Sequence, residues 1–487
     1  MMTNTFPRLR ISGTITNKTD LMIGSGLEIR NPANQQDDSS PTYTAICLGA
    51  DKKPYIPASS LRGLLLSLCK KCYPNSPLIH QLFGNGKQAV NPDEPATGNS
   101  RMGALRIYDA ICDIPFLPEK PTVRTSNAID PSYGTAKDNM LYSHAYVPEG
   151  ASFTSQIEAD NLNQTEIEQL LGLLAQLKES PFSQLGKGQS RQQGLITWQQ
   201  TKVEAITEEA LINWLLDKNS LKLSLPEKTF TPQEPPCKPK LNRLFKLKLV
   251  PQSPILINDP ERISVSKNKQ NQEKNRQNEA EKGQVDFAFR RNRQDQLIIP
   301  ASSLKGVMRS HCRKILMTLL VEKLNIDEDE KTNPANKIAD PLIDALFGST
   351  GQQSNIWLTD GAGVDTTPIK QTFNAIDRFT GGVAPGALYT VEAASAARIE
   401  CDLYQKHDFT DWQIGLLILL LRDAMEGDLS FGWGKSKGYG SIKLVEISDN
   451  QKTFTEWEAL YRQNDKPMQD YVHALNNHLD KQLSGEN

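Results

Sequence analysis

A seven-residue phrase occurs twice in this chain of 487 residues. It reads PASSLRG at 57–63 and PASSLKG at 300–306, a separation of 243 residues. Further motifs recur downstream of each copy in one order: LFG at 82–84 and 346–348, NAID at 127–130 and 374–377, and a Gly-rich segment at 186–194 and 432–440. Because the recurrence is ordered and most separations are similar, we predict a tandem duplication of roughly 240 residues.

The sequence between the repeats predicts where the domains end. Residues 225–240, LPEKTFTPQEPPCKPK, contain five prolines and show neither helical nor strand periodicity, as expected of a linker. We therefore expect a first unit at 1–224, a Pro-rich linker at 225–240, a second unit at 241–456, and a polar, helical C-terminal tail at 457–487.

Each unit shows the same series of strand and helix patterns. A strand and a long loop come first, followed by a strand, a helix that begins at PASS, and a variable insert. A strand, a hairpin, a capped helix, a Gly-rich turn and a last strand complete the unit. Strands that alternate with helices favour an α/β (α+β) sandwich, here tandem ferredoxin-like domains. The hairpins are predicted at 125–146 and 372–393.

The chain as a whole lacks the basic excess that is typical of nucleic-acid-binding proteins. It has 55 Lys and Arg residues against 57 Asp and Glu residues, for a net charge of −2. Locally, residues 262–293 contain nine Lys or Arg and four Asp or Glu among many Asn and Gln. Such a segment is a solvated flexible loop, or one that orders on a polyanion, and both readings are compatible.

The sequence gives no sign of export or membrane insertion. The N-terminal MMTNTFPRLRIS has no apolar core, and the longest apolar run, at 414–421, is far short of the ~20 residues needed to span a bilayer. We expect a cytoplasmic protein with no membrane partner. The seven scattered cysteines argue against disulfides. Cys69 and Cys72 could share zinc with Cys112, but helical spacing and the lack of a second CxxC favour partly buried thiols.

The PASS motifs place serines where a helix N-cap is expected. Their hydroxyls can satisfy free backbone N–H groups, and a helix start also favours an anion. Simple capping and phosphate binding are both open. The residues that would suit a phosphate are Ser59, Ser60, Arg62, Ser302, Ser303 and Lys305. Two later helices begin with capping boxes, Thr165 with Glu168 and Thr410 with Gln413.

The Gly-rich segments resemble nucleotide-binding loops only at first sight. Gly434-Lys435-Ser436 has Leu429 where a Walker loop needs its first glycine, so an ATPase is excluded. A permissive backbone with nearby Lys187, Arg191, Lys435 and Lys437 would instead let a sugar–phosphate chain approach. Hairpin residues Met140, Tyr142, Leu388 and Tyr389 could stack on bases or wedge between them, although ordinary sheet packing is the simpler explanation.

Candidate catalytic residues are acids rather than histidines. The six histidines show no metal spacing and no shared place in the repeat. Asp37 and Asp38 precede the first PASS motif, and Asp286 precedes the second. A lone loop aspartate is usually only solvated. Beside bound RNA, however, it could hold Mg²⁺ through water or help to deprotonate a 2′-hydroxyl.

Taken together, IPxSSL[KR]G, the NAID hairpin with its Gly-rich tip and the terminal G-x-G-K-x-x-G-x-G resemble the RAMP superfamily of CRISPR proteins. The resemblance is to the backbone subunit of type III effector complexes, with two units fused as in subtype III-D. It implies an RNA-recognition-like core, and thumb hairpins that displace guide–target base pairs. It also implies that a loop aspartate cuts target RNA with Mg²⁺ or another divalent cation. By position, Asp38 and Asp286 match that aspartate, with Asp37 an unresolved neighbour.

The implied partners are guide (CRISPR) RNA, complementary target RNA and other type III effector subunits. Departures from the family pattern leave open whether both units cleave. Met22 and Leu256 stand where many relatives have a histidine, Arg378 has no counterpart in the first repeat, and the Asp38 loop is about five residues longer. Two alternatives remain: a non-catalytic scaffold that binds guide RNA, and an enzyme that trims precursor guide RNA.

Overall fold

The computed structural model describes residues 5–30, 42–85, 101–114, 122–130, 135–178, 183–217, 223–238, 242–259, 285–292, 294–325, 334–384, 387–449, 452–457 and 468–484. The chain divides into two compact units with the main boundary between residues 241 and 242, and each unit is described by itself. Within these ranges, no helix is long and apolar enough to cross a membrane.

The first unit is built on an antiparallel sheet whose centre is the first strand. β1 (Thr5–Asn17) pairs with β11 (Ser152–Asn163) and with β12 (Ile196–Ile206). Beyond β11 lie three short strands, β7 (Leu105–Ile107), β8 (Ala110–Cys112) and β4 (Tyr55–Ile56). Along β1, Leu9, Ile11 and Ile15 are almost fully buried and alternate with Arg8 and Arg10, so one face of the sheet is apolar.

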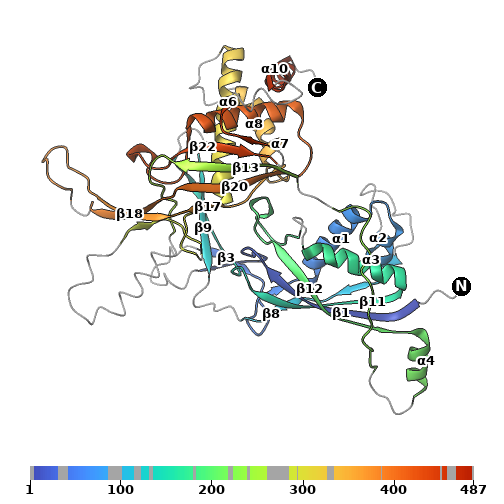
Figure 1. The fold of residues 1–487 in the computed structure, drawn as a ribbon. Coiled ribbons are helices and arrows are strands. Elements are labelled where there is room, and N and C mark those ends of the chain that lie inside the picture. Colours follow the sequence, from blue (N-terminus) through green and yellow to red (C-terminus); the bar gives the residue numbers. More distant parts are fainter. Residues whose placement is uncertain are drawn as a thin grey trace, which may run out of the picture. The chain divides into compact units, whose positions relative to one another are not determined.

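Helices cover that apolar face. α1 (Ala58–Cys72) and α3 (Gln164–Ala175) lie along the sheet, with 3₁₀ turn η2 (Gln176–Lys178) after α3 (Figure 1). Smaller elements surround them: α2 (Pro77–Phe83), β5 (Gly84–Asn85), β6 (Arg101–Met102), η3 (Gln189–Arg191) and α4 (Glu208–Leu216).

The second unit repeats this plan. β13 (Asn242–Pro251) lies between β20 (Arg398–Gln405) and β22 (Ser441–Ser448), all antiparallel. The sheet is completed by β15 (Ile298–Ile299), β16 (Ile356–Leu358), β17 (Gly361–Val364), β21 (Leu429–Ser430) and β23 (Thr453–Phe454). Its helices are α6 (Ala301–Leu324), α7 (Pro334–Phe347), α8 (Asp411–Glu426) and α10 (Met468–Ser484), with η5 at Lys435–Lys437.

The strand order confirms the predicted ferredoxin-like class for both units. When the four core strands of each unit are numbered in chain order, their order in the sheet is fourth–first–third–second. A helix follows the first strand and another follows the third. The sequence patterns do not distinguish β11 and β20 from the preceding hairpins. These strands become distinct only because each pairs along its whole length with the first strand of its unit.

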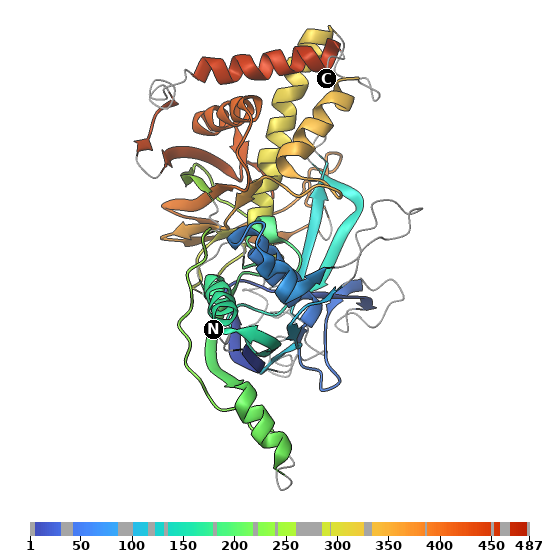
Figure 2. The same ribbon diagram turned by 90° about the vertical axis from the view of Figure 1, so that its right-hand side faces the viewer.

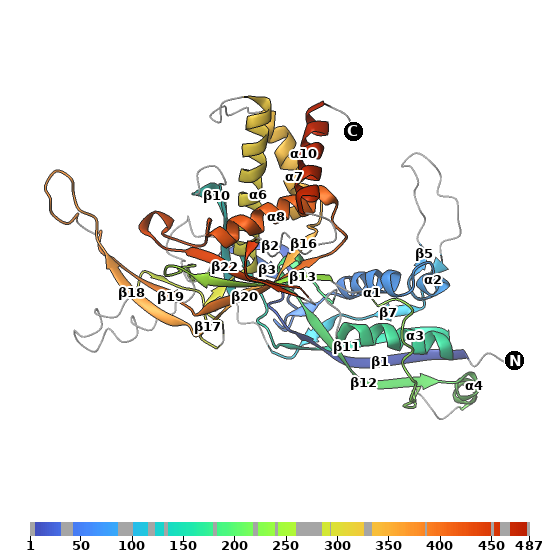
Figure 3. The ribbon, with the colours of Figure 1, turned by 45° about the horizontal axis from the view of Figure 1, so that its top comes forward.

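A second, smaller sheet carries the hairpin in each unit. In the first unit its order is β2 (Gly24–Arg30), β3 (Thr42–Ile46), β10 (Ala136–Ala145) and β9 (Val123–Ile129). In the second it is β14 (Phe287–Ala288), β19 (Tyr389–Ser395) and β18 (Thr367–Phe373). Figure 3 shows β18 and β19 projecting from their unit as a long arm. This arm begins at Thr367, five residues before the predicted hairpin start at 372.

Different segments cover the equivalent capped helices α3 and α8 of the two units. In the second unit α10 packs on α8 (Figure 2). Gly415 of α8 admits the α10 backbone, because a Cβ there would lie 2.2 Å from Tyr471 O. In the first, residues 223–238 cross α3: Gln233 N donates to Glu168 O at 2.8 Å, and a Cβ at Gly172 would lie 1.7 Å from Gln233 O. The expected Pro-rich linker thus packs on the first unit over most of its length.

The helix starts differ from the predicted ones in part. The capping box of α8 is Thr410 with Gln413, as predicted. That of α3 is Asn163 with Glu166, two residues before the predicted Thr165 and Glu168, because β11 runs straight into the helix. At the PASS motifs the N-cap residues are Pro57 and Pro300, without side-chain caps, so the predicted serine N-caps are wrong.

Backbone pairing aligns the two units residue by residue. The bridge Leu48–Pro54 matches Arg291–Leu297, and Gly24–Ile46 matches Asn258–Phe289, which fixes a separation of 243 residues from the β3 segment to the PASS motif. The parallel pairs His144–Thr44 and Val391–Phe287 fix a separation of 247 for the hairpin. Equivalent positions named below rest on this register.

Candidate nucleic-acid interface

Asp286 stands at the start of the strand that borders the second hairpin sheet. Its Oδ2 accepts a hydrogen bond from Thr390 N at 2.8 Å, and its own N–H donates to Thr390 O at 2.7 Å. The side chain is exposed, and among the described residues Oδ1 has no hydrogen-bond partner. The backbone of β19 therefore orients this carboxylate while one of its oxygens faces outward.

Behind Asp286, a buried ion pair joins its segment to the same strand. Arg291 contacts Glu392 through Nη2 and Oε1, and Glu392 is only 5% exposed. The guanidinium also lies over the ring of buried Phe289, with 4.3 Å from Cζ to the ring centroid. The Asp286 segment is thus fastened to β19 by side chains as well as by its backbone pairing.

Aromatic rings gather around Lys437 at the base of the hairpin. Phe373 stacks on Tyr389 with centroids 5.4 Å apart, and Phe287 stacks on Trp433 at 5.7 Å. The Lys437 ammonium lies 4.8–5.3 Å from three of these ring centroids and contacts the Tyr389 hydroxyl. We call Phe287, Phe373, Tyr389, Trp433, Tyr439 and Lys437 the aromatic cluster. Because Phe287 follows Asp286 and Tyr389 precedes Thr390, the cluster adjoins the carboxylate.

Glycine positions seat the Gly-rich loop in both units. Gly432 has φ +82°, and a Cβ there would lie 2.3 Å from Leu256 O; Gly186 has φ +78°, with Met22 O at 2.0 Å. The next residues, Trp433 and Lys187, donate their N–H to those same carbonyls. Met22 and Leu256, which the sequence placed where relatives have a histidine, thus lie beneath their loops. Lys187, Arg191, Lys435 and Lys437 all belong to these loops.

The first unit has no carboxylate at the position of Asp286. Tyr43 precedes Pro57 by 14 residues, as Asp286 precedes Pro300 by 14, and Tyr43 is only 3% exposed. Asp37 and Asp38 lie outside the described residues. The five extra residues noted in the sequence therefore stand before this strand, so that Asp38 comes five positions ahead of the Asp286 equivalent.

Carboxylates occupy the starts of the PASS helices. Ala58 N donates to Asp109 Oδ1, and Ala301 N donates to Asp360 Oδ1, both at 2.7 Å. The motif serines follow in the first turn: Ser59 is exposed, and Ser60, Ser302 and Ser303 are partly buried. An acid already satisfies the first N–H in each unit, so any phosphate would bind the serines beside it rather than the helix end.

The basic residues of the PASS motifs have different surroundings. Arg62 Nη2 donates to Phe83 O at 2.6 Å and its guanidinium lies over the Phe83 ring, which ties the motif to LFG. Lys305, at the same place on α6, is partly buried. The backbone carbonyl after Phe347 is instead bound by Arg309, whose Nη1 lies 2.8 Å from Gly348 O. Arg62 therefore has a structural role that sequence reasoning missed.

The predicted thumb residues are found on the hairpins, with different neighbours. Met140 and Tyr142 are exposed on β10, and Tyr142 stacks on His144. Leu388 is 67% exposed, whereas Tyr389 belongs to the aromatic cluster. Arg378 is exposed at the second tip, beside Phe379, which is 100% exposed. Asp377 of the NAID motif shapes this tip: hydrogen bonds from the N–H groups of Thr380 and Phe379 lower its pKa.

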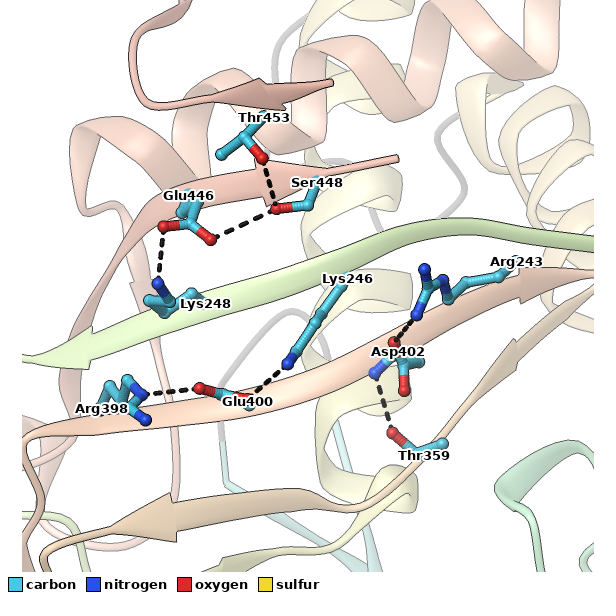
Figure 4. Close-up of polar contacts among 10 residues, drawn as sticks. All are labelled: Arg243, Lys246, Lys248, Thr359, Arg398, Glu400, Asp402, Glu446, Ser448 and Thr453. Carbon is cyan, nitrogen blue, oxygen red and sulfur yellow. Dashed lines mark hydrogen bonds and ion pairs between the residues drawn. The ribbon is translucent and has the colours of Figure 1, made fainter. Parts of the chain in front are cut away.

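On the main sheet of the second unit, the face opposite the helices carries ion pairs between its own side chains (Figure 4). Glu400 accepts from Lys246 and Arg398, which lower its pKa to about 2. Lys248 pairs with Glu446 at 2.6 Å, and Arg243 pairs with Asp402. RNA-recognition sheets stack bases on exposed aromatic rings. This face instead carries carboxylates that are already paired with basic side chains. We therefore expect RNA to run over the hairpin base and the Gly-rich loop rather than over this face.

Two further groups of residues bear on metal binding. The CxxC thiols are buried on α1, as predicted, and burial raises the pKa of Cys69 to about 12 and that of Cys72 to about 11. Within the described ranges the sole cluster of three potential ligands is Asp423, Glu426 and Asp428, away from Asp286 in the fold. At Asp286 an exposed carboxylate, whose Oδ1 has no partner among the described residues, fits a hard divalent cation that keeps most of its water.

Both halves of the chain match the RAMP superfamily, over residues 14–197 and 225–443. The chain belongs to the RAMP superfamily. Among curated proteins, none matches it. RAMP proteins bind CRISPR RNA within multi-subunit effector complexes, and some of them are ribonucleases. The two matched regions agree with two fused RAMP units.

Proposed function

We propose that this chain is a double backbone subunit of a type III CRISPR effector complex, which binds guide RNA and cuts complementary target RNA beside Asp286. The observation that supports cleavage is the exposed Asp286 carboxylate, oriented by Thr390 N–H at the base of a projecting hairpin and next to a lysine held by aromatic rings. An acid in this place suits RNA cleavage because a carboxylate can bind the attacking 2′-hydroxyl or a hydrated metal ion.

In the proposed mechanism each group has one role. Asp286 orients the attacking 2′-hydroxyl, or the water that removes its proton, through Oδ1. Mg²⁺ or another divalent cation would supply electrostatic stabilisation of the phosphate charge. Lys437 and Lys435 place cations near the phosphates, and the hairpin residues Leu388 and Phe379 separate one base from its neighbours. The 2′-oxygen bonds to phosphorus as the P–O5′ bond breaks. The 2′-proton passes to solvent and the 5′-oxygen takes a proton from solvent, which leaves a 2′,3′-cyclic phosphate and a free 5′-hydroxyl.

Guide binding would use hydroxyls and cations from both units. Ser59, Ser60, Ser302 and Ser303 offer hydroxyls, and Lys187, Arg191, Lys305 and Arg378 offer cations. Arg62 would reach a phosphate only through the donors that Phe83 O leaves free. For the first unit, Asp38, with Asp37 beside it, stays our proposal for a second metal-binding and catalytic acid.

The test is cleavage of an end-labelled complementary RNA by the reconstituted guide complex with Mg²⁺. Wild type is compared with Asp286→Ala, Asp38→Ala and the double variant, and RNA affinity is measured for each. We expect Asp286→Ala to abolish one band and to leave affinity unchanged, and a target with a 2′-deoxy nucleotide at that position to resist cutting. If every band survives in the double variant, the chain is a scaffold and its nuclease role is rejected.

A further inference from the structure

The second unit contains a largely buried ion pair, Arg291 with Glu392. Glu392 lies in β19 with 5% of its surface exposed, and the Arg291 side chain is 17% exposed. Removing two charges from water costs several kcal/mol per ion, so such a pair is often no more stabilising than apolar residues. Arg291 also reaches Asp295, but the Asp295 side chain is 84% exposed and such a contact contributes little.

The first unit shows the apolar version of the same site. In the established register, Leu48 stands at the position of Arg291 and Ala145 at that of Glu392. Leu48 packs against the first-unit core, and Ala145 is fully buried. The bridges on both sides are preserved: Leu48 pairs with Pro54, and Arg291 pairs with Leu297. The same backbone is therefore built with leucine and alanine.

The charged version occurs in the unit that carries Asp286. Arg291 follows Asp286 by five residues on one segment, and Glu392 follows Thr390 by two residues on β19. The ion pair therefore joins the two segments that the Asp286–Thr390 hydrogen bonds also join. In β19, residues 390 and 392 point to the same side, so the two links act at neighbouring places along one strand.

We propose that Arg291 and Glu392 are positioning residues for Asp286, which hold its segment in register with Thr390. The proposal rests on the cleavage role given to Asp286 above. An exposed carboxylate at the end of a two-residue strand is easily displaced, and errors of about 1 Å in reacting groups cost rate by as much as ~100-fold. A directional, charged link adds to the backbone pairing of β14 with β19 in resisting sliding of the strand, whereas leucine and alanine at these positions supply no directional link.

The decisive variant copies the first unit: Arg291→Leu with Glu392→Ala. It removes both charges of the pair together, unlike either single variant, so it is expected to fold. Lys248→Leu with Glu446→Ala is the matched control, since it removes an ion pair between β13 and β22 on the outer face of the same unit. Arg291→Lys tests whether a conserved charge restores function. All are assayed in the guide complex and as free protein.

Two readouts are needed. In single-turnover cleavage we expect the Asp286-dependent band of the leucine–alanine variant to form about tenfold or more slowly, with RNA affinity within about twofold of wild type. In hydrogen exchange of the free protein, the peptide that contains Thr390 should exchange faster, while peptides from α6 and α8 stay unchanged. The matched control should change neither readout, and Arg291→Lys should recover part of the rate.

Each outcome decides a different claim. A wild-type cleavage rate in the leucine–alanine variant rejects the positioning role, as does a slower rate accompanied by faster exchange throughout α6 and α8, which would mark a purely structural pair. If Asp286→Ala keeps the band, the proposed cleavage role fails instead. The positioning claim is then judged by exchange at Thr390 alone, and unchanged exchange there rejects it.

Discussion

The two units of this chain share a frame and differ around one strand. Both have a central first strand, a PASS helix capped by a distant aspartate, and a Gly-rich loop seated on the carbonyl of Met22 or Leu256. They differ where the second hairpin meets its unit, at the pairs Tyr43/Asp286, Leu48/Arg291, Ser126/Phe373, Ala145/Glu392 and Lys187/Trp433.

This comparison separates the residues that both units need to fold from the residues that only the second unit has. The shared positions satisfy backbone groups or allow close approach, and both copies need them. The positions that differ supply a carboxylate, an ion pair and rings, and the first unit folds without them. We therefore expect substitutions in the frame to affect the two units alike, and substitutions in the second group to affect the second unit alone.

The largest expected effect is at the glycines that seat the loops. Gly432→Ala and Gly186→Ala should each destabilise their own unit by about 2–4 kcal/mol, because a Cβ would collide with a carbonyl at a backbone angle that favours glycine. Gly438→Ala is the control: its φ is +80° but nothing lies within 4 Å of the new Cβ, so about 1 kcal/mol is expected. Denaturant titration followed by hydrogen exchange reports each unit separately. If Gly186→Ala left the stability of the first unit unchanged, the two loops would not be equivalent.

The aromatic cluster should behave asymmetrically. Phe373→Ser, which installs the first-unit residue, should cost the second unit about 2 kcal/mol, since it removes a half-buried ring that stacks on Tyr389. The equivalent Ser126→Ala should change the first unit by less than about 0.5 kcal/mol. The same exchange-resolved titration measures both. Equal costs in the two units would show that the cluster belongs to the shared frame.

The distant helix caps should again act alike. Asp109→Ala and Asp360→Ala each leave a helix N–H without its carboxylate, at an expected cost of about 1 kcal/mol to the unit concerned. Asp→Asn at the same positions keeps an acceptor oxygen and should recover most of this loss. Exchange rates of the first turns of α1 and α6 provide the local measurement, and a loss in only one unit would contradict the shared role.

The smallest effect concerns pH. Hydrogen bonds from Lys246 and Arg398 lower the pKa of Glu400 from 4.5 to about 2, so its contribution to stability is present above about pH 4.5 and is lost as the pH falls toward 2. Because both partners are 43% exposed, we expect Glu400→Gln to lose only about 1 kcal/mol at pH 7 and nothing near pH 2. Urea midpoints at the two pH values test this. If Glu400→Gln lowered the stability by the same amount at both pH values, the ion pair would be excluded as the cause.

Much of this architecture can be predicted from the sequence, because repeats and alternation are local patterns. The PASS helices, the hairpins, the Gly-rich turns and the Thr410 box of α8 all follow from short motifs. The α3 box was misplaced by two residues because Thr165 and Glu168 fit the same motif as Asn163 and Glu166. Only the end of β11 decides between them, and strand ends depend on pairing with β1.

The site is less accessible to sequence reasoning because it depends on residues far apart in the chain. Asp109 and Asp360 lie about 50 and 60 residues from the N–H groups that they cap, and no local signal links them. Arg291 and Glu392 are 101 residues apart. Asp38 and Asp286 both precede a PASS motif, but counting back from it places Tyr43, not Asp38, at the Asp286 position. The five-residue difference is evident in the sequence, but only the backbone pairing of β3 and β14 shows that it falls before the strand.

Residues 223–238 complete the first unit, and their place in the sequence affects folding during translation. Lys228 N donates to Val203 O and Cys237 N donates to Cys72 O, so this segment lies along strand and helix alike. During translation it leaves the ribosome before β13, which begins at Asn242. The first unit can therefore fold before the second unit has been fully synthesised. Fused repeats are prone to exchange strands while folding, and synthesis in this order keeps the two copies of one strand plan from competing.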